Sequence, residues 1–76
     1  MKEIAPKISV DPRVRFGKPV ITGTRVPVHL IVDKIAAGAS PAEICREYGL
    51  KSAEIKAALN YASGIIKQES LMYIGG

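Results

Sequence analysis

The sequence lacks the residues on which most enzymes and metal sites depend. It has a single cysteine, Cys45, so no disulfide can form within the chain. Its only histidine is His29, and one cysteine with one histidine cannot supply the four ligands of an ordinary zinc site. No paired carboxylates and no nucleophile beside a base can be recognised. We therefore expect no catalytic residue, no metal, no cofactor and no small-molecule substrate, and we do not expect an enzyme.

Long apolar runs are also missing. No stretch approaches the roughly 20 residues that cross a bilayer, and the opening segment, Met1–Pro6, lacks the apolar run of a secretion signal. Hydrophobic residues make up 47% of the chain and charged residues 24%, which is typical of globular proteins. We expect a cytoplasmic protein with no membrane contact. A chain of 76 residues forms one domain at most and buries only roughly 60% of its surface, which favours a homodimer.

Positive charge is concentrated near the N-terminus. The chain carries a net charge of +4. Residues 1–25 contain six basic and two acidic residues, whereas the basic and acidic residues of the remainder balance. A basic segment beside a neutral body indicates a polyanion or an acidic protein as partner, although a solvated surface explains the charge equally well.

Residues 1–26 are predicted to form a short β-ribbon. Ile8-Ser9-Val10 and Val14-Arg15-Phe16 alternate apolar and polar residues, and Val20-Ile21-Thr22 also suits a strand. Gly17-Lys18-Pro19 and Thr22-Gly23-Thr24 are typical of turns. We expect two or three strands that pack on helices or on another chain.

Residues 27–69 are predicted to form three helices. Pro27 suits the first residue of a helix, and Gly38 suits the position after its end. Ser40-Pro41-Ala42-Glu43 is a capping box that starts a second helix over residues 41–48. Ser52 is predicted to cap the third helix. The predicted inward positions of the first and third helices are Val28, Ile31, Val32, Ile35, Ile55, Ala58, Leu59, Ala62 and Ile66.

The link between the second and third helices indicates a helix-turn-helix. Gly49 permits a sharp turn, Leu50 fills the corner, and Ile44, Tyr48 and Ile55 face inward around it. The predicted fold is therefore mainly α: a three-helix, helix-turn-helix bundle with a short N-terminal β-ribbon.

Two groups of residues are candidates for contact with duplex DNA. On the third helix and the turn before it, these are Lys51, Lys56 and Asn60. In the ribbon, they are Arg13, Arg15, Lys18 and Arg25. The helix offers few side chains that read bases, so a scaffold or interface role for the helix pair stays open.

The last segment, residues 70–76, is predicted to be an apolar tail beyond the third helix. Leu71, Met72, Tyr73 and Ile74 are four consecutive apolar residues. They can pack on their own core or on a dimer mate, which we favour, or they can insert into a partner protein.

Several motifs resemble the domain of unknown function 433 family. They are Asp11-Pro12, Phe16–Ile21, Gly23–Val28, Gly38–Ile44 and Ala57–Ala62. The resemblance covers about residues 8–64. It implies a prokaryotic, homeodomain-like helix-turn-helix protein, and it implies an antitoxin encoded beside a toxin with a PIN-like nuclease fold. In such an antitoxin the apolar tail is a candidate toxin-binding element.

Two functions are consistent with the sequence. One is an antitoxin-like DNA-binding protein that neutralises a PIN-like toxin and represses its own operon. The other is a non-enzymatic protein interaction module that never touches DNA.

Overall fold

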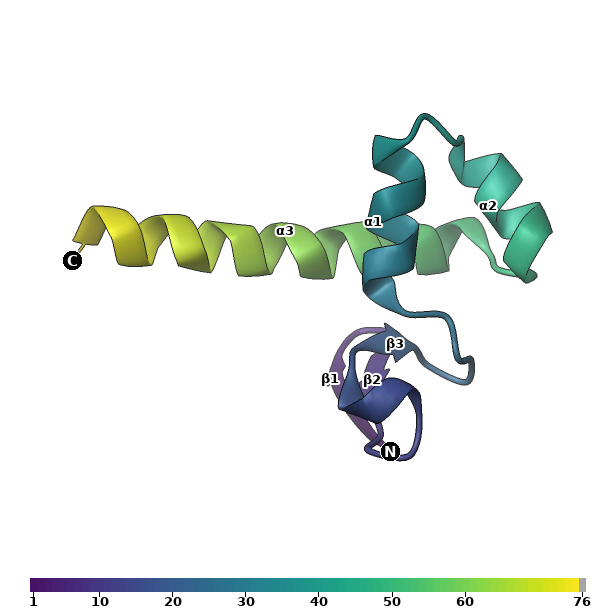
Figure 1. Cartoon of the computed structure of the whole chain (residues 1–76), viewed down its shortest axis with the longest axis horizontal. Helices are drawn as coiled ribbons and strands as arrows, with labels where there is room; N and C mark the ends of the chain where they lie inside the picture. Colours follow the sequence, from purple (N-terminus) through teal and green to yellow (C-terminus); the bar gives the residue numbers. More distant parts are fainter. Residues whose placement is uncertain (76) are drawn as a thin grey trace.

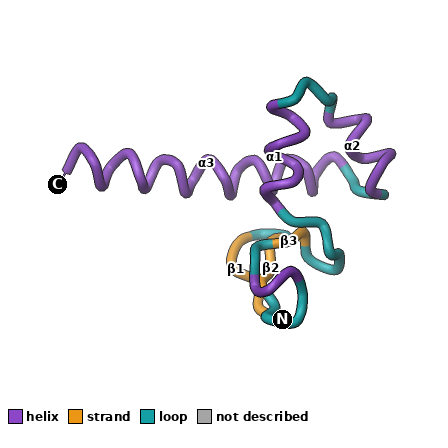
Figure 2. The backbone as a smooth tube through the Cα atoms, in the orientation of Figure 1, coloured by secondary structure: helices purple, strands orange, loops and turns teal. Residues whose placement is uncertain are grey.

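The computed structural model places three helices beside a small sheet, which confirms a mainly helical fold with an N-terminal ribbon (Figures 1 and 2). It describes the backbone of residues 1–75 and the side chains of residues 1–68. The elements, in chain order, are β1 (Lys2–Ala5), β2 (Ile8–Val10), a 3₁₀ turn (Arg15–Gly17), β3 (Val20–Ile21), α1 (Val28–Ala36), α2 (Pro41–Tyr48) and α3 (Ser52–Gly75).

The ribbon is a three-stranded antiparallel sheet in the order β1-β2-β3. β2 and β3 lie where the sequence predicts them, and Ile8 pairs with Ile21 in register. Both isoleucines are fully buried because this face of the sheet packs on the helices. β1 was not predicted, since Lys2–Ala5 has no clear alternation. The predicted strand at Val14–Phe16 is wrong, because a 3₁₀ turn occupies that segment.

α1 ends as the sequence predicts and begins one residue later. Pro27 has an extended backbone (φ −74°, ψ 147°) and precedes the helix, so its predicted place as the first helical residue is wrong by one position. At the other end the amide of Gly38 donates to the Ile35 carbonyl, and that of Ala39 donates to the Lys34 carbonyl, both at 3.0 Å. These two bonds satisfy carbonyls that the helix end would otherwise leave unpaired.

α2 is defined by its two ends. The Glu43 amide donates to Ser40 Oγ (3.2 Å), and the Ser40 amide donates to Glu43 Oε1 (3.1 Å), which confirms the predicted capping box. Gly49 follows the helix with a left-handed backbone (φ 68°). The Leu50 amide then donates to the Cys45 carbonyl at 3.0 Å, and the Leu50 side chain is buried in the corner.

α3 begins with a cap that differs from the predicted one. Ser52 is the first helical residue, and Lys51 holds the capping position. The Lys51 amide donates to Glu54 Oε1 (2.9 Å), and the Lys51 carbonyl accepts from the Glu54 amide (2.9 Å). The prediction that Ser52 caps this helix is therefore wrong by one residue.

α3 also runs further than predicted. The predicted helix ends at residue 69, whereas the observed helix continues to Gly75 and its far half projects well beyond the other elements (Figure 1). Ile66 was placed on the inward face but is 60% exposed, because the helix has already left the core there. The side chains of the predicted partner-binding residues Leu71, Met72, Tyr73 and Ile74 lie outside the described residues.

The core lies where the sheet, α1, α2 and the first half of α3 meet. Its buried members are Ile8, Ile21, Val28, Ile31, Ile44, Leu50, Ile55 and Ala58. This packing leaves the loops between β2 and α1, the hairpin turn between β1 and β2, and the far half of α3 at the surface.

Candidate nucleic-acid interface

Three of the predicted DNA-binding residues gather around one hollow of the ribbon. Arg13, Arg15 and Arg25 line a depression of about 350 Å³ together with Pro12 and Phe16. Arg15 Nε donates to the Arg25 carbonyl oxygen at 3.2 Å, which ties the loop after β2 to the turn after β3. All three arginines are exposed. The ribbon thus presents a cluster of guanidinium groups, here called the arginine cluster.

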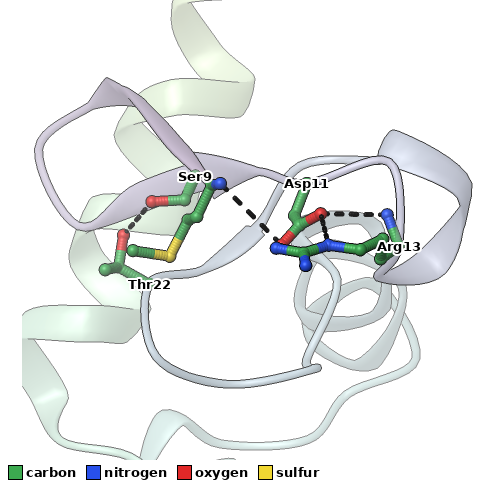
Figure 3. Close-up of polar contacts among 5 residues, drawn as sticks. Ser9, Asp11, Arg13 and Thr22 are labelled. Carbon is green, nitrogen blue, oxygen red and sulfur yellow. Dashed lines mark hydrogen bonds and ion pairs between the residues drawn. The ribbon is translucent and has the colours of Figure 1, made fainter.

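One carboxylate lies beside this cluster and holds Arg13. Asp11 Oδ1 accepts from the Arg13 backbone amide (2.9 Å) and from Arg13 Nε (3.2 Å), and Oδ2 accepts from Arg13 Nη2 at 3.3 Å (Figure 3). The hydrogen bonds from Arg13 hold the pKa of the Asp11 carboxyl below its ordinary value, and Asp11 raises the pKa of Arg13. Asp11 therefore stays ionised and offsets one of the three positive charges.

Phe16 is the residue of this site that the sequence analysis missed. Its side chain is 98% exposed, the largest exposure of any large hydrophobic residue among the described side chains. Arg15, Phe16 and Gly17 have left-handed backbones in succession, with φ of 52°, 56° and 81°. The motif Arg15-Phe16-Gly17 carries the signal in the sequence, since a lone aromatic between an arginine and a glycine suits a turn better than a strand.

A second hollow lies between the β1–β2 hairpin turn and α3. It has a volume of about 370 Å³, and its walls are Ala5, Pro6, Lys7, Ala53, Lys56, Ala57, Asn60 and Tyr61. It brings together Lys56 and Asn60, two of the predicted DNA-binding residues, and adds Lys7, which the prediction omitted. Lys7 stands in the hairpin turn with φ 64°, and its carbonyl accepts from the Thr22 amide at 2.9 Å. We call this region the hairpin–helix groove.

The remaining two candidates lie apart from both regions. Lys51 is exposed at the start of α3 and lines neither hollow. Lys18 lies at the edge of a third, largely apolar depression of about 470 Å³ between α1 and α3. The seven predicted residues therefore do not form one continuous site.

Two acidic side chains near the start of α3 already have hydrogen-bond or ion-pair partners within the protein. Glu54 accepts from the Lys51 amide at the helix start. Glu47 pairs with Lys34 Nζ at 3.5 Å, and this contact raises the pKa of Lys34. The charged side chains that line the hairpin–helix groove are Lys7 and Lys56, and the Glu3 carboxylate accepts from the Lys7 backbone amide at 2.7 Å in the same hairpin.

The other reactive residue types are dispersed. His29 is exposed on α1, and Cys45 is half-buried against the core. Among the described residues, no three His, Cys, Asp or Glu side chains lie close enough to hold a metal ion. None of the helices described here is both long and apolar enough to cross a membrane.

Comparison with known proteins identifies the family. A crystal structure of a DUF433 member protein from Anabaena variabilis is 32% identical with a TM-score of 0.75, over 82% of this chain and 62% of that one. The X-ray structure of Rv2018 from Mycobacterium tuberculosis is 31% identical with a TM-score of 0.63, over 68% of this chain and 24% of that one. The chain thus spans less than two thirds of either protein.

Curated proteins give no significant match. The sequence profile described as "Protein of unknown function (DUF433)" matches residues 8–62, which is most of the chain. This match confirms the resemblance drawn from the motifs between Asp11 and Ala62. The chain belongs to the DUF433 family.

Proposed function

We propose that this protein binds duplex DNA through the hairpin–helix groove and the adjoining ribbon. The observation that carries the proposal is the position of Lys7 in the hairpin turn, beside Lys56 and Asn60 of α3. A helix that enters the major groove places its N-terminal half against base edges, and a flanking hairpin reaches the phosphates. Lys56 suits a phosphate or a guanine, and Asn60 suits an adenine.

The distribution of charge supports the same function. The whole excess of positive charge lies in residues 1–25, and its arginines are exposed on the ribbon. Contacts between basic side chains and phosphates release counterions, which provides most of the affinity of non-specific binding. The ribbon therefore supplies the general affinity that α3 lacks.

We also propose an antitoxin role, which the family resemblance described above implies. In that role the protein neutralises a PIN-like toxin and represses its own operon. The far half of α3, with Leu71, Met72, Tyr73 and Ile74, is the proposed toxin-binding segment. Co-purification of the protein with the product of the adjacent gene tests this role, and loss of the complex on deletion of residues 70–76 is the expected result. A complex that survives this deletion contradicts the assignment of the segment.

DNA binding is tested by fluorescence anisotropy with a labelled duplex of mixed sequence at several salt concentrations. Each phosphate contact contributes about 0.9 to the slope of log K against log salt, so Lys7→Gln with Lys56→Gln lowers the slope by nearly two. Lys67→Gln is the matched control, because Lys67 is exposed on the far half of α3. Absence of a complex at micromolar protein and low salt contradicts the proposal.

A second candidate, a protein interaction module, is favoured by the apolar depression between α1 and α3. Ile65 and Ile66 at its edge are 39% and 60% exposed. We propose a second copy of this chain as the occupant, because the exposed Ile65 and Ile66 of one copy can pack against the same largely apolar depression of the other. A two-fold contact requires this self-complementarity. Sedimentation of the dimer, and its dissociation by Ile66→Asn, are the expected results. A monomer at high concentration contradicts this candidate.

A further inference from the structure

Phe16 occupies a position that the fold does not require. It is the only phenylalanine in the chain, and 98% of its side chain is exposed, so it contributes nothing to the core. Its backbone is left-handed at φ 56°, a conformation that non-glycine residues adopt rarely. Such conformations persist only where the surroundings enforce them, and they gather at functional sites.

The surrounding turn holds Phe16 firmly. The Val14 amide donates to the Asp11 carbonyl at 2.8 Å, and the Gly17 amide donates to the Val14 carbonyl at 3.1 Å. The Lys18 amide donates to the Arg15 carbonyl at 3.1 Å. Together with the Arg15 bond to the loop before α1, these contacts preorganise the turn. An aromatic ring on a rigid turn loses little conformational entropy when it binds a partner.

The side chains around Phe16 indicate the chemistry of that partner. Arg13, Arg15 and Arg25 line the hollow beside the ring, and one carboxylate, Asp11, offsets a single charge. Burial of this cluster in an apolar protein pocket requires desolvation of three guanidinium groups, which is costly. A nucleic acid offers flat base faces for the ring and phosphates for the arginines.

We propose that Phe16 stacks on a nucleobase of bound DNA, as a wedge at a partly opened base step, while the arginine cluster contacts the neighbouring phosphates. Apolar side chains that insert between base steps from the minor groove act in this way. The inference rests on the proposed function, because it adds a base contact to a protein that binds duplex DNA.

The chain has no tryptophan, so Phe16→Trp places a single reporter at the site. Duplex DNA is expected to quench the fluorescence of the introduced indole at saturation, because stacked bases quench it, and added salt is expected to reverse the quenching. Ala36→Trp is the matched control, since Ala36 is exposed near the end of α1 and lines neither the arginine cluster nor the hairpin–helix groove, and its fluorescence is expected to stay unchanged. An unchanged Phe16→Trp signal, while anisotropy reports a saturated complex, overturns the proposal and leaves Phe16 to a protein partner.

A second variant separates binding from folding. Phe16→Gly removes the ring and suits the left-handed backbone, so the urea midpoint should stay at or above that of the unsubstituted protein. Its affinity for the duplex should fall about ten-fold or more, as for loss of one stacked base. Unchanged affinity overturns the stacking proposal. Failure of the unsubstituted protein to bind any duplex instead overturns the proposed function, so the two outcomes are distinct.

Discussion

Ser9 is a buried polar residue of the ribbon. It is fully buried, and its hydroxyl forms a hydrogen bond of 2.6 Å with the hydroxyl of Thr22 (Figure 3). A buried hydroxyl without a partner costs about 1–3 kcal/mol. We therefore expect Thr22→Val to lower the free energy of unfolding by about that amount, measured by urea denaturation. The double variant with Ser9→Ala should lose less than the sum of the two single variants, and an additive double variant contradicts the pairing.

Glu43 makes the capping box sensitive to acid. The hydrogen bonds with Ser40 hold the pKa of Glu43 below its ordinary value. Its contribution to stability is therefore complete above the unfolded pKa of about 4.3 and is lost as the pH falls through the lower folded value. We expect the melting temperature to fall over this acidic range.

Glu43→Gln tests this origin of the acid dependence. A glutamine still accepts the bond from the Ser40 amide but does not titrate, so this variant should have a flatter profile below pH 5. Thermal melts at a series of pH values provide the measurement. Equal slopes for the two proteins contradict the assignment, and Glu43→Ala should lower the melting temperature at neutral pH as well.

Individual residues differ in how far the sequence determines them. Ser40 and Glu43 act through local spacing, so their capping box was predictable. Phe16 and Lys7 were missed because their roles depend on left-handed turns, which non-glycine residues seldom adopt. Contacts distant in sequence help to hold both turns, through the Arg15 bond to the Arg25 carbonyl and the Thr22 amide bond to the Lys7 carbonyl.

At the scale of elements, the turn between α2 and α3 depends on Gly49. Its φ is 68°, and nothing lies within 4 Å of a Cβ placed there, so strain alone opposes substitution. We expect Gly49→Ala to destabilise the protein by about 1–2 kcal/mol. Gly64 is also free of neighbours but lies in the helical interior of α3. Gly64→Ala should therefore stabilise the helix by up to about 1 kcal/mol. Chemical denaturation measures the free energy of unfolding of each variant. Changes of the same sign in both variants contradict this explanation.

The existence of the elements was more predictable than their limits. The helices follow from the spacing of apolar residues and from local caps. The end of α3 was misplaced because neither proline nor glycine stands between Lys67 and Ile74, so no residue there breaks the helix. β1 was missed because its pairing with β2, not its own pattern, defines it. The hairpin–helix groove joins residues 5–7 to residues 53–61, and such a contact cannot be derived from local spacing.

The whole molecule has two distinct parts, a compact body and a projecting helix. The compact body carries the sheet, the arginine cluster and the hairpin–helix groove, whereas α3 extends alone beyond it (Figure 2). A helix of 24 residues is about 36 Å long. We therefore propose that DNA binds the body, and that protein, either a second copy or a toxin, contacts the depression along α1 and the far half of α3.

We propose above that DNA contacts the ribbon side of the body. This proposal can be tested by adding a short duplex to isotope-labelled protein and measuring the NMR chemical shifts of the backbone amides. The chain is only 8.1 kDa, so amides on all its surfaces can be observed in one experiment. We expect amide shifts that cluster at Lys7, Phe16, Lys56 and Asn60 and that vanish at high salt. Shifts confined to the α1–α3 depression around Val32 and Ile66, or no shifts at low salt, would contradict it.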